Sequence, residues 1–297
     1  MGRLNGKVAI ISGGARGLGA ANAGILAAEG ANVVIADEHE TEGKELVKSL
    51  GSQGCFVFID VADPSDWMKT VEIAENTFGR VNILVNNTGI ENHAPFDEYT
   101  NQQFGESIEG NLYGTFYAMK AVIPSMKIAG SGSIINVSSV SGLQGYSGQP
   151  GYVASNWGVR GLTKSAALDL ARYHIRVNSV HPGQILTPQT RSGDIETGHI
   201  AMHRLGTPDE IARVVLFLAM RGPRAPRQRR DCKRDQPRGD GTRDSERHDR
   251  PAGAGTVVRS QHFSFLSLLP GGRYILFHNN SLSSSDPFPG IEGSAWK

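Results

Sequence analysis

Short β-branched runs alternate with longer amphipathic stretches along the chain from Val8 to about Ala219. The runs have the composition of buried strands, and the stretches between them repeat apolar residues at helical spacing. This alternation predicts a single α/β domain with a doubly wound parallel sheet. The expected strands read VAIIS, VVIAD, CFVFID, VNILVNN, SIINVSS and RVNSVHP, and the expected helices include 152–173 and a last one reading IARVVLFLA.

The pattern stops abruptly after Ala219, where the chain becomes rich in Arg, Asp, Pro and Gly. Such a stretch lacks the apolar surface that would offset its chain entropy, so we expect it to be disordered. The sequence therefore predicts a domain over 1–219 and an aberrant Arg/Pro-rich tail over 220–297. Within the tail, 263–269 and 274–277 flank a Pro-Gly-Gly turn and suggest an isolated hairpin. The sharp change favours a reading-frame shift near Met220 or a mispredicted gene end.

Charge divides the chain at the same place. Residues 1–220 hold 16 basic and 21 acidic residues, whereas 221–297 hold 14 basic and 8 acidic residues. A genuine basic tail that binds nucleic acid through 221–250 is the alternative to a frame shift. It is disfavoured, because no aromatic residues interleave that run to stack on bases and five aspartates dilute its charge.

Composition narrows the class of protein further. The chain has 297 residues, of which 39% are hydrophobic, and this suffices for a packed core. Only Cys55 and Cys232 are present and no signal-peptide pattern opens the chain, which argues against a disulfide-bonded secreted protein. No apolar run approaches the roughly 20 residues of a membrane helix. We therefore expect a cytoplasmic protein without a membrane partner, and no metal site is predicted.

A glycine-rich turn joins the first expected strand to the first expected helix. Glycines at such a turn let the backbone approach a pyrophosphate at the helix N-terminus. The turn therefore predicts a dinucleotide site, although a tight turn without a ligand would also use glycines. The candidate cofactor-binding residues at this turn are Ser12, Gly13, Arg16, Gly17, Leu18 and Gly19.

The second expected strand ends in Asp37, about 20 residues after the glycine turn. A carboxylate at that place can accept hydrogen bonds from the adenosine ribose hydroxyls and would repel a 2′-phosphate. We therefore predict NAD rather than NADP as the cofactor. The alternative is a solvated charge at a strand end, next to Glu38.

Two further motifs follow the third and fourth strands, namely Asp60-Val61 and NNTG at 86–89. Together with the glycine turn, they make residues 5–219 resemble the short-chain dehydrogenase/reductase family. The motif sequences are similar to those of bacterial hydroxysteroid dehydrogenases. The resemblance implies a Rossmann-type fold in which Asp60 and Val61 border the adenine and Asn87 and Gly89 touch the cofactor. Thr88 departs from the alanine of the family motif.

Later parts of the chain match the family unevenly. Pro182-Gly183 matches a Pro-Gly motif, which implies that Ile185 and Thr187 hold the nicotinamide carboxamide. In the family, the helix that ends near Ala219 is followed by a stretch resembling SSxVTG and a strand ending VDGG. Neither is present in this chain, so the last family strand is expected to be missing.

The resemblance assigns catalysis to an asparagine, a serine, a tyrosine and a lysine. Asn111, Ser139 and Tyr152 match the first three, with Ser139 thirteen residues before Tyr152 and Ser138 off that spacing by one. Tyr152 would exchange a proton with the alcohol or carbonyl oxygen, Ser139 would hydrogen-bond the same oxygen, and a hydride would move to or from the nicotinamide. This implies an oxidoreductase that interconverts a secondary alcohol and a ketone.

The lysine position, four residues after Tyr152, holds Asn156. Ionising a phenol near pH 7 requires lowering its pKa of about 10 by about 3 units, or roughly 4 kcal/mol. A cation about 4 Å away supplies roughly that energy at an effective dielectric constant of 20, and a neutral amide does not. Impaired activity is therefore expected, with Asn156 only partly replacing the lysine at the nicotinamide ribose. The resemblance assigns Tyr152 and Asn156 to cofactor binding as well as to catalysis. Arg160 is interpreted as a packing or surface residue, and Lys164 lies too far along the helix.

Substrate and assembly follow only from the resemblance. It implies that 144–151 and 188–204 line the pocket of a small alcohol or ketone, with a steroid, a sugar and other alcohols all open as substrates. It also implies a homodimer or homotetramer. A non-catalytic NAD-binding scaffold or sensor is the alternative function, favoured by Asn156 and the missing strand.

Overall fold

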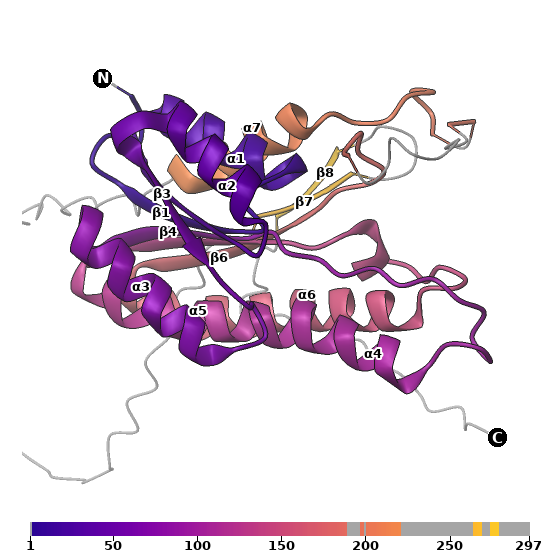
Figure 1. Cartoon of the computed structure of the whole chain (residues 1–297). Helices are drawn as coiled ribbons and strands as arrows, with labels where there is room; N and C mark the ends of the chain where they lie inside the picture. The colour runs from indigo at the N-terminus through magenta and orange to yellow at the C-terminus, as the bar shows by residue number, and fades with distance from the viewer. Residues whose placement is uncertain (1, 189–196, 199, 221–263, 269–273, 279–297) are drawn as a thin grey trace, which may run out of the picture. The chain divides into compact units, whose positions relative to one another are not determined.

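The chain forms one sheet with helices on both faces in a computed structural model that describes residues 2–188, 197–198, 200–220, 264–268 and 274–278 (Figure 1). The strands are β1 (Val8–Ser12), β2 (Asn32–Asp37), β3 (Gly54–Phe58), β4 (Val81–Asn86), β5 (Gly132–Val137), β6 (Ile175–His181), β7 (Ser264–Leu268) and β8 (Tyr274–His278). Their order in the sheet is β3-β2-β1-β4-β5-β6-β7-β8.

The first six strands are all parallel. The chain builds outward from β1 through β2 to β3, and then returns to the other side of β1 to add β4, β5 and β6. This reversal confirms the predicted doubly wound sheet. In such sheets the crevice at the carboxyl ends of the strands on either side of the reversal is the usual ligand site. In this protein it lies beyond the ends of β1 and β4.

Two layers of helices cover the sheet. In Figure 1, α1, α2 and α7 lie on one face, and α3, α5 and α6 lie on the other. The helices are α1 (Gly17–Ala28), α2 (Glu40–Leu50), α3 (Pro64–Phe78), α4 (Asn101–Ser107), α5 (Gly114–Ile128), α6 (Pro150–Leu170) and α7 (Pro208–Met220). None of the helices in the described part of the chain is long and apolar enough to cross a membrane.

Alternation along β1 supplies both halves of the core, because successive side chains of a strand point to opposite faces. Ile10 packs in the cluster that holds Trp67 of α3, whereas Ile11 packs in the cluster that holds Leu26 of α1 and Val215 of α7. All of these side chains are buried. Strands buried on both faces explain why the sequence shows apolar runs instead of an alternation of apolar and polar residues.

The hairpin expected near the C-terminus is present but is not isolated. β7 and β8 pair antiparallel, and β7 also pairs parallel with β6 through Val180↔Leu266 and His181↔Ser267. The expectation of an isolated pair is therefore wrong. Physically, the far edge of β6 offers unpaired backbone groups, and an added strand satisfies them. The family strand ending VDGG is still absent from the sequence, and β7 is the segment that lies beside β6.

Several sequence predictions fall outside the described residues. They are the disorder expected for 221–260, the basic run at 221–250, and the part of the substrate loop at 189–196. The last helix, α7, ends at Met220, where the apolar pattern of the sequence also stops.

Candidate active site

The glycine turn brings backbone against backbone at the start of α1. Gly13 and Gly17 have φ of +58° and +53°, a region that side chains rarely adopt. A Cβ atom on Gly19 would lie 1.9 Å from the carbonyl oxygen of Gly13. The turn therefore requires glycine for its own conformation, and in doing so it leaves the N-terminus of a 12-residue helix facing the crevice.

Side chains of the NNTG motif hold this turn in place. The hydroxyl oxygen of Ser12 accepts hydrogen bonds from the backbone N–H groups of Asn87 and Thr88, at 3.0 and 3.2 Å. Asn87 in turn donates from Nδ2 to the carbonyl oxygen of Gly13, at 3.0 Å. Ser12 thus links the ends of β1 and β4, the two strands that flank the crevice.

A cavity of about 490 Å³ opens between the glycine turn and the ends of the strands. It contains most of the cofactor-binding residues expected from the sequence. Those that line it are Gly13, Arg16, Gly17, Leu18, Asp37, Asp60, Val61, Asn87, Gly89 and Thr187.

Two polar atoms at this cavity lack partners, which tests whether a dinucleotide fits. Asn87 Oδ1 and Thr88 Oγ1 are buried and have no hydrogen-bond partner in the described part of the protein. Buried polar atoms are normally hydrogen-bonded, so unpaired ones indicate a missing polar group. Together with the helix N-terminus they suit a ligand that carries both phosphate and polar heterocyclic groups. The residues present therefore fit a dinucleotide.

Asp37 lines this cavity and is 6% exposed. Its Oδ2 accepts from the backbone N–H of Ala15 at 2.9 Å. Its Oδ1 accepts from the backbone N–H of His39 at 2.9 Å and lies 2.8 Å from Nδ1 of the same residue. The carboxylate is thus fixed in orientation by the glycine turn. The motif spacing does not predict the contact between Asp37 and the His39 ring.

A second cavity, of about 310 Å³, adjoins the first. The two share Leu18, Asn87, Thr88 and Gly89. The remaining residues that line it are Glu91, His93, Asn111, Thr115, Val137, Ser138, Tyr152, Asn156 and Val159. It therefore brings together three of the four expected catalytic positions at the end of the dinucleotide cavity.

Asn111 lies in a π-helical turn, Ile108–Tyr113, that interrupts the helix expected through this segment. Its Oδ1 accepts from the backbone N–H of Ile90 at 2.6 Å, and its Nδ2 donates to the Ile90 carbonyl at 2.9 Å and to Ser155 Oγ at 3.0 Å. Asn111 thereby ties the loop after β4 to α6. Single π turns are frequent at functional sites, and the apolar pattern of the sequence does not predict this one.

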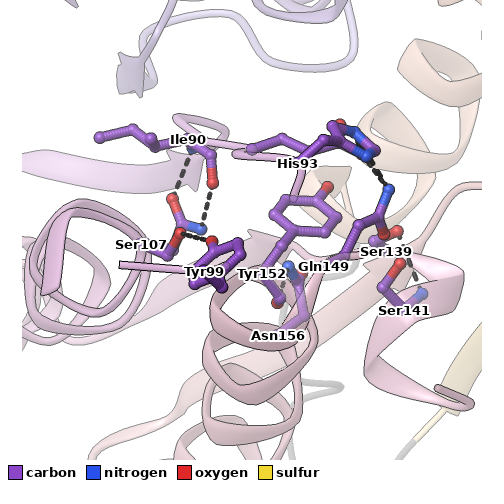
Figure 2. A network of polar contacts seen from close by, with 11 residues as sticks. Ile90, His93, Tyr99, Ser107, Ser139, Ser141, Gln149, Tyr152 and Asn156 are labelled. Carbon is purple, nitrogen blue, oxygen red and sulfur yellow. Dashed lines mark hydrogen bonds and ion pairs between the residues drawn. The ribbon is translucent and has the colours of Figure 1, made fainter. Parts of the chain in front are cut away.

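Asn156 uses both ends of its amide within the protein, and Figure 2 shows its contact with the backbone of Tyr152. Oδ1 accepts from the hydroxyl of Ser138 at 2.9 Å, and Nδ2 donates to the backbone carbonyl of Tyr152 at 2.9 Å. The residue is 5% exposed. It is therefore a neutral, buried group whose hydrogen bonds are directed at the helix and at Ser138, the serine that the motif spacing disfavoured.

Tyr152 is half-buried at the base of the second cavity. Burial raises the pKa of its hydroxyl above the usual 10, and the negative charge of Glu91 raises it further. Hydrogen bonds with Ser139 and Asn156 act in the opposite direction but are the smaller causes. At pH 7 the phenol is therefore protonated, and it is better placed to give a proton than to take one.

No lysine or arginine is among the described residues that line the second cavity. Arg160 points elsewhere: its Nη1 donates to the carbonyl oxygen of Gly142 at 3.5 Å, and its guanidinium lies 5.3 Å from the centre of the Trp157 ring. These contacts agree with the packing role expected for it. The absence of a cation is thus a property of the described site as well as of the motif.

The backbone of Ser139 is in contact with buried His181. The Ser139 hydroxyl accepts from the backbone N–H of Ser141 at 3.1 Å, and its carbonyl lies 3.0 Å from Nδ1 of His181. Nε2 of His181 lies 2.9 Å from the hydroxyl of Ser179. Burial lowers the pKa of His181 to about 4, the Ser139 carbonyl opposes this, and the charge of Arg160 adds to the lowering. The imidazole is therefore neutral.

We expect His181 to make folding pH-dependent. Its pKa is about 4 when folded and 6.5 when unfolded, so the unfolded chain binds the proton first as pH falls. Stability should be complete above pH 6.5 and should fall by roughly 3 kcal/mol by pH 4 through this residue. Urea unfolding at pH 7 and pH 4 measures the fall. In His181→Gln the loss of stability between pH 7 and pH 4 should be smaller by roughly 3 kcal/mol. An equal loss in both proteins would contradict this role of His181.

A few expected site residues lie outside both cavities. Ser12, Gly19, Ser139 and Ile185 are not among the described lining residues. Ser12 and Gly19 shape the turn, and Ile185 is buried and forms a backbone bridge to Gly206. Conversely, sequence reasoning missed Glu91 and His93, because they lie in an irregular loop without a motif or a period.

Comparison with known proteins gives a consistent result. The family described as short chain dehydrogenase matches residues 7–196. The chain is 45% identical over 226 residues to trans-4-hydroxycyclohexanecarboxylate dehydrogenase of Sinomonas cyclohexanicum, covering 73% of this chain and 87% of that one. It is 43% identical over 218 residues to 3-alpha-(or 20-beta)-hydroxysteroid dehydrogenase of Mycobacterium tuberculosis, covering 73% and 84%. The crystal structure of gox2181 matches with a TM-score of 0.70 and 34% identity, covering 73% of this chain and 90% of that one.

Proposed function

The chain belongs to the short-chain dehydrogenase family, and from this premise we propose that it is an NAD-dependent oxidoreductase that interconverts a ring-borne secondary alcohol and its ketone. The observation that carries the proposal is the junction of the two cavities, where Tyr152 meets the end of the glycine-lined crevice. A ring is proposed because the names of two relatives, a hydroxycyclohexanecarboxylate dehydrogenase and a hydroxysteroid dehydrogenase, specify one.

The proposed chemistry divides between the cofactor and the chain. When bound, NAD supplies the hydride chemistry, and Gly13, Gly17, Asp37 and Thr187 are the residues that would hold it. Tyr152 gives a proton to the carbonyl oxygen during reduction and takes one from the hydroxyl during oxidation. Since the pKa of Tyr152 is raised, its phenol is protonated at pH 7. Reduction requires this form, whereas oxidation requires a group that can accept a proton. The impaired activity that we propose is therefore mainly an impaired oxidation.

The choice of NAD over NADP rests on Asp37. The carboxylate is buried and accepts a hydrogen bond from the backbone N–H of Ala15. Rotating it away from a ligand would break that buried hydrogen bond. Ribose hydroxyls would donate to it, whereas a 2′-phosphate would place two negative charges together. Arg16 also lines the cavity, but it lies 3.9 Å from Glu42, which offsets its attraction for a phosphate.

Titration of the purified chain with NADH and NADPH, followed by nicotinamide fluorescence, tests this proposal. NADH should bind at least about tenfold more tightly, equal to about 1.4 kcal/mol, and Asp37→Ser should narrow the difference. Glu98→Gln, at an exposed position outside both cavities, is the matched control and should change nothing. Tighter binding of NADPH to the unmodified chain would contradict the choice of cofactor.

A second experiment separates the enzyme from a non-catalytic NAD-binding scaffold or sensor, which the raised pKa of Tyr152 and the neutral Asn156 favour. A single turnover is followed at 340 nm with trans-4-hydroxycyclohexanecarboxylate or a 3α-hydroxysteroid as the probe, and with the matching ketones in reverse. Slow hydride transfer supports the enzyme. Tight binding of NAD with no transfer to or from any of these probes supports the sensor.

Assembly and location complete the proposal. We include a homodimer or homotetramer, because Tyr113, Phe116 and Trp157 on and beside α5 and α6 expose between 44% and 49% of their surface, and a second copy could cover them. The mass of the chain in solution, by light scattering, measures this. The cytoplasmic location stays a prediction from the sequence.

A further inference from the structure

We propose that His93, oriented by Glu91, accepts the proton of Tyr152 during alcohol oxidation and so replaces the function of the missing cation. This inference rests on the proposed function. It answers a problem that the site itself poses, since Tyr152 is protonated and no described cationic side chain lines its cavity.

His93 lies where such a group is needed. It comes from the loop after β4 and lines the same cavity as Tyr152 and Glu91. Figure 2 shows the Tyr152 phenol rising from α6 with its hydroxyl toward the side chains of His93 and Gln149. Glu91 lines this cavity as well, and its negative charge raises the pKa of the Tyr152 hydroxyl.

The contacts of His93 within the described residues all involve Nε2. Nε2 lies 3.0 Å from Oε1 of Glu91, and Gln149 Nε2 lies 2.6 Å from the same oxygen and 3.2 Å from His93 Nε2. An ionised carboxylate only accepts hydrogen bonds, and the Gln149 amide also donates to Glu91. The proposal therefore takes the tautomer in which Nε2 of His93 donates to Glu91 and Nδ1 carries the lone pair. Nδ1 has no partner among the described residues. It is thus available as a base.

This arrangement repeats the logic of a carboxylate that orients a catalytic histidine. Glu91 fixes the tautomer and stabilises the imidazolium once a proton arrives. The same carboxylate makes a free Tyr152 phenolate less favourable, because two negative charges would then face each other. Glu91 therefore opposes the usual use of the tyrosine and favours a transfer in which no phenolate accumulates.

The proposed step moves two protons. The hydroxyl proton of the substrate passes to the Tyr152 oxygen as the proton of that phenol passes to Nδ1 of His93, directly or across one water. The C–H bond of the substrate breaks, and its electron pair leaves with the hydrogen to the bound dinucleotide, as the proposed function requires. The imidazolium then releases its proton to solvent, which its side chain reaches because 62% of it is exposed. Reduction is the reverse sequence.

Other groups near this site do not serve the same purpose. His181 is buried behind Ser139, with both ring nitrogens engaged by Ser139 and Ser179. Glu106 accepts hydrogen bonds from Asn92 and Gln102 and lines the first cavity, not the second. Among the charged and titratable residues in the described part of the chain, Glu91 and Tyr152 are those that line the cavity with His93.

Rates of single-turnover oxidation at pH 7 test the proposal, with NAD and whichever of the two alcohol probes reacts faster. His93→Gln and His93→Ala should each lower the rate by about a hundredfold, with KM and NAD affinity little changed. Imidazole added to the buffer should restore part of the rate of His93→Ala but not of His93→Gln, whose side chain fills the space. His174→Asn is the matched control, because His174 is exposed, lines neither cavity, and has a left-handed backbone that asparagine tolerates.

A measurement without substrate checks the geometry. Glu91→Gln should lower the pKa of Tyr152, read as phenolate absorbance in an alkaline titration with Tyr152→Phe as the blank. Glu98→Gln should leave that titration unchanged. An unshifted titration in Glu91→Gln, or His93 variants that oxidise as fast as the unmodified chain, would overturn the inference while leaving the proposed function intact. No hydride transfer by the unmodified chain would overturn both.

Discussion

Asn156→Lys is expected to raise the rate of alcohol oxidation at pH 7 by up to about a thousandfold. Lysine places a cation one helical turn from Tyr152, on the same face of α6. A charge about 4 Å away at an effective dielectric constant of 20 is worth roughly 4 kcal/mol, which is about three orders of magnitude in rate. Reduction should gain less, because neutral Tyr152 is already the proton donor there.

The surroundings of Asn156 set an upper limit on this gain. The amide accepts from Ser138 and donates to the Tyr152 carbonyl, and a lysine keeps only the ability to donate. Glu91 faces the same cavity, so the new cation also gains a carboxylate that competes with the phenolate for it. A thousandfold is therefore the upper limit of the expected gain in oxidation rate.

The measurement is a pH profile of single-turnover oxidation and reduction for both proteins. Asn156→Gln is the matched control, since it keeps a neutral amide and lengthens the side chain, and it should give no gain. If the unmodified chain oxidises as fast as the lysine variant, the His93 relay alone serves Tyr152. If the lysine does assist Tyr152, His93→Gln should lower the oxidation rate much less in the Asn156→Lys variant than in the unmodified chain.

The sheet and its reversal were predictable because they rest on patterns that the chain repeats. Each of the six parallel strands is an apolar run with a helix after it, and βαβ connections leave little freedom in their topology. The glycine turn and Asp37 were predictable for a similar reason, since a pyrophosphate and a ribose impose fixed spacing on one strand, one turn and the next strand.

The contacts that decide the chemistry were not predictable in the same way. Asn156 is visible in the sequence as a departure from a motif, but its bond to Ser138 spans two elements and depends on the angle between them. Glu91 and His93 lie in an irregular loop, and Gln149 reaches them from the start of another element 56 residues or more away in sequence. Such long-range polar contacts leave no local pattern.

The C-terminal hairpin shows a related limit. Two apolar runs around Pro-Gly-Gly indicate a hairpin, but local sequence does not tell which edge it joins. Pairing of β7 with β6 depends on the unpaired edge of a strand more than 80 residues earlier, at Val180 and His181.

Tyr152→Phe is expected to abolish most hydride transfer while leaving NAD binding unchanged, and it should also remove the gain made by lysine at 156. Positioned acid–base groups contribute about a hundredfold to ten-thousandfold, so the loss should fall in that range in both directions of the reaction. Tyr173→Phe supplies the control, since Tyr173 follows the C-terminal end of α6 and lines neither cavity. A Tyr152→Phe protein that retains the full rate would assign the proton transfer to another group and contradict the proposed roles of both Tyr152 and His93.

Coupling Tyr152→Phe to Asn156→Lys tests how the lysine acts, which neither variant tests alone. If lysine stabilises the phenolate, Tyr152→Phe and the double variant should oxidise alcohol at the same low rate, because the group that the lysine assists is gone. If the double variant remains faster than Tyr152→Phe, lysine works through the nicotinamide ribose instead, and NADH affinity should rise with it. Single-turnover rates and NADH titrations of the same four proteins therefore separate the two ways in which a cation at position 156 can contribute.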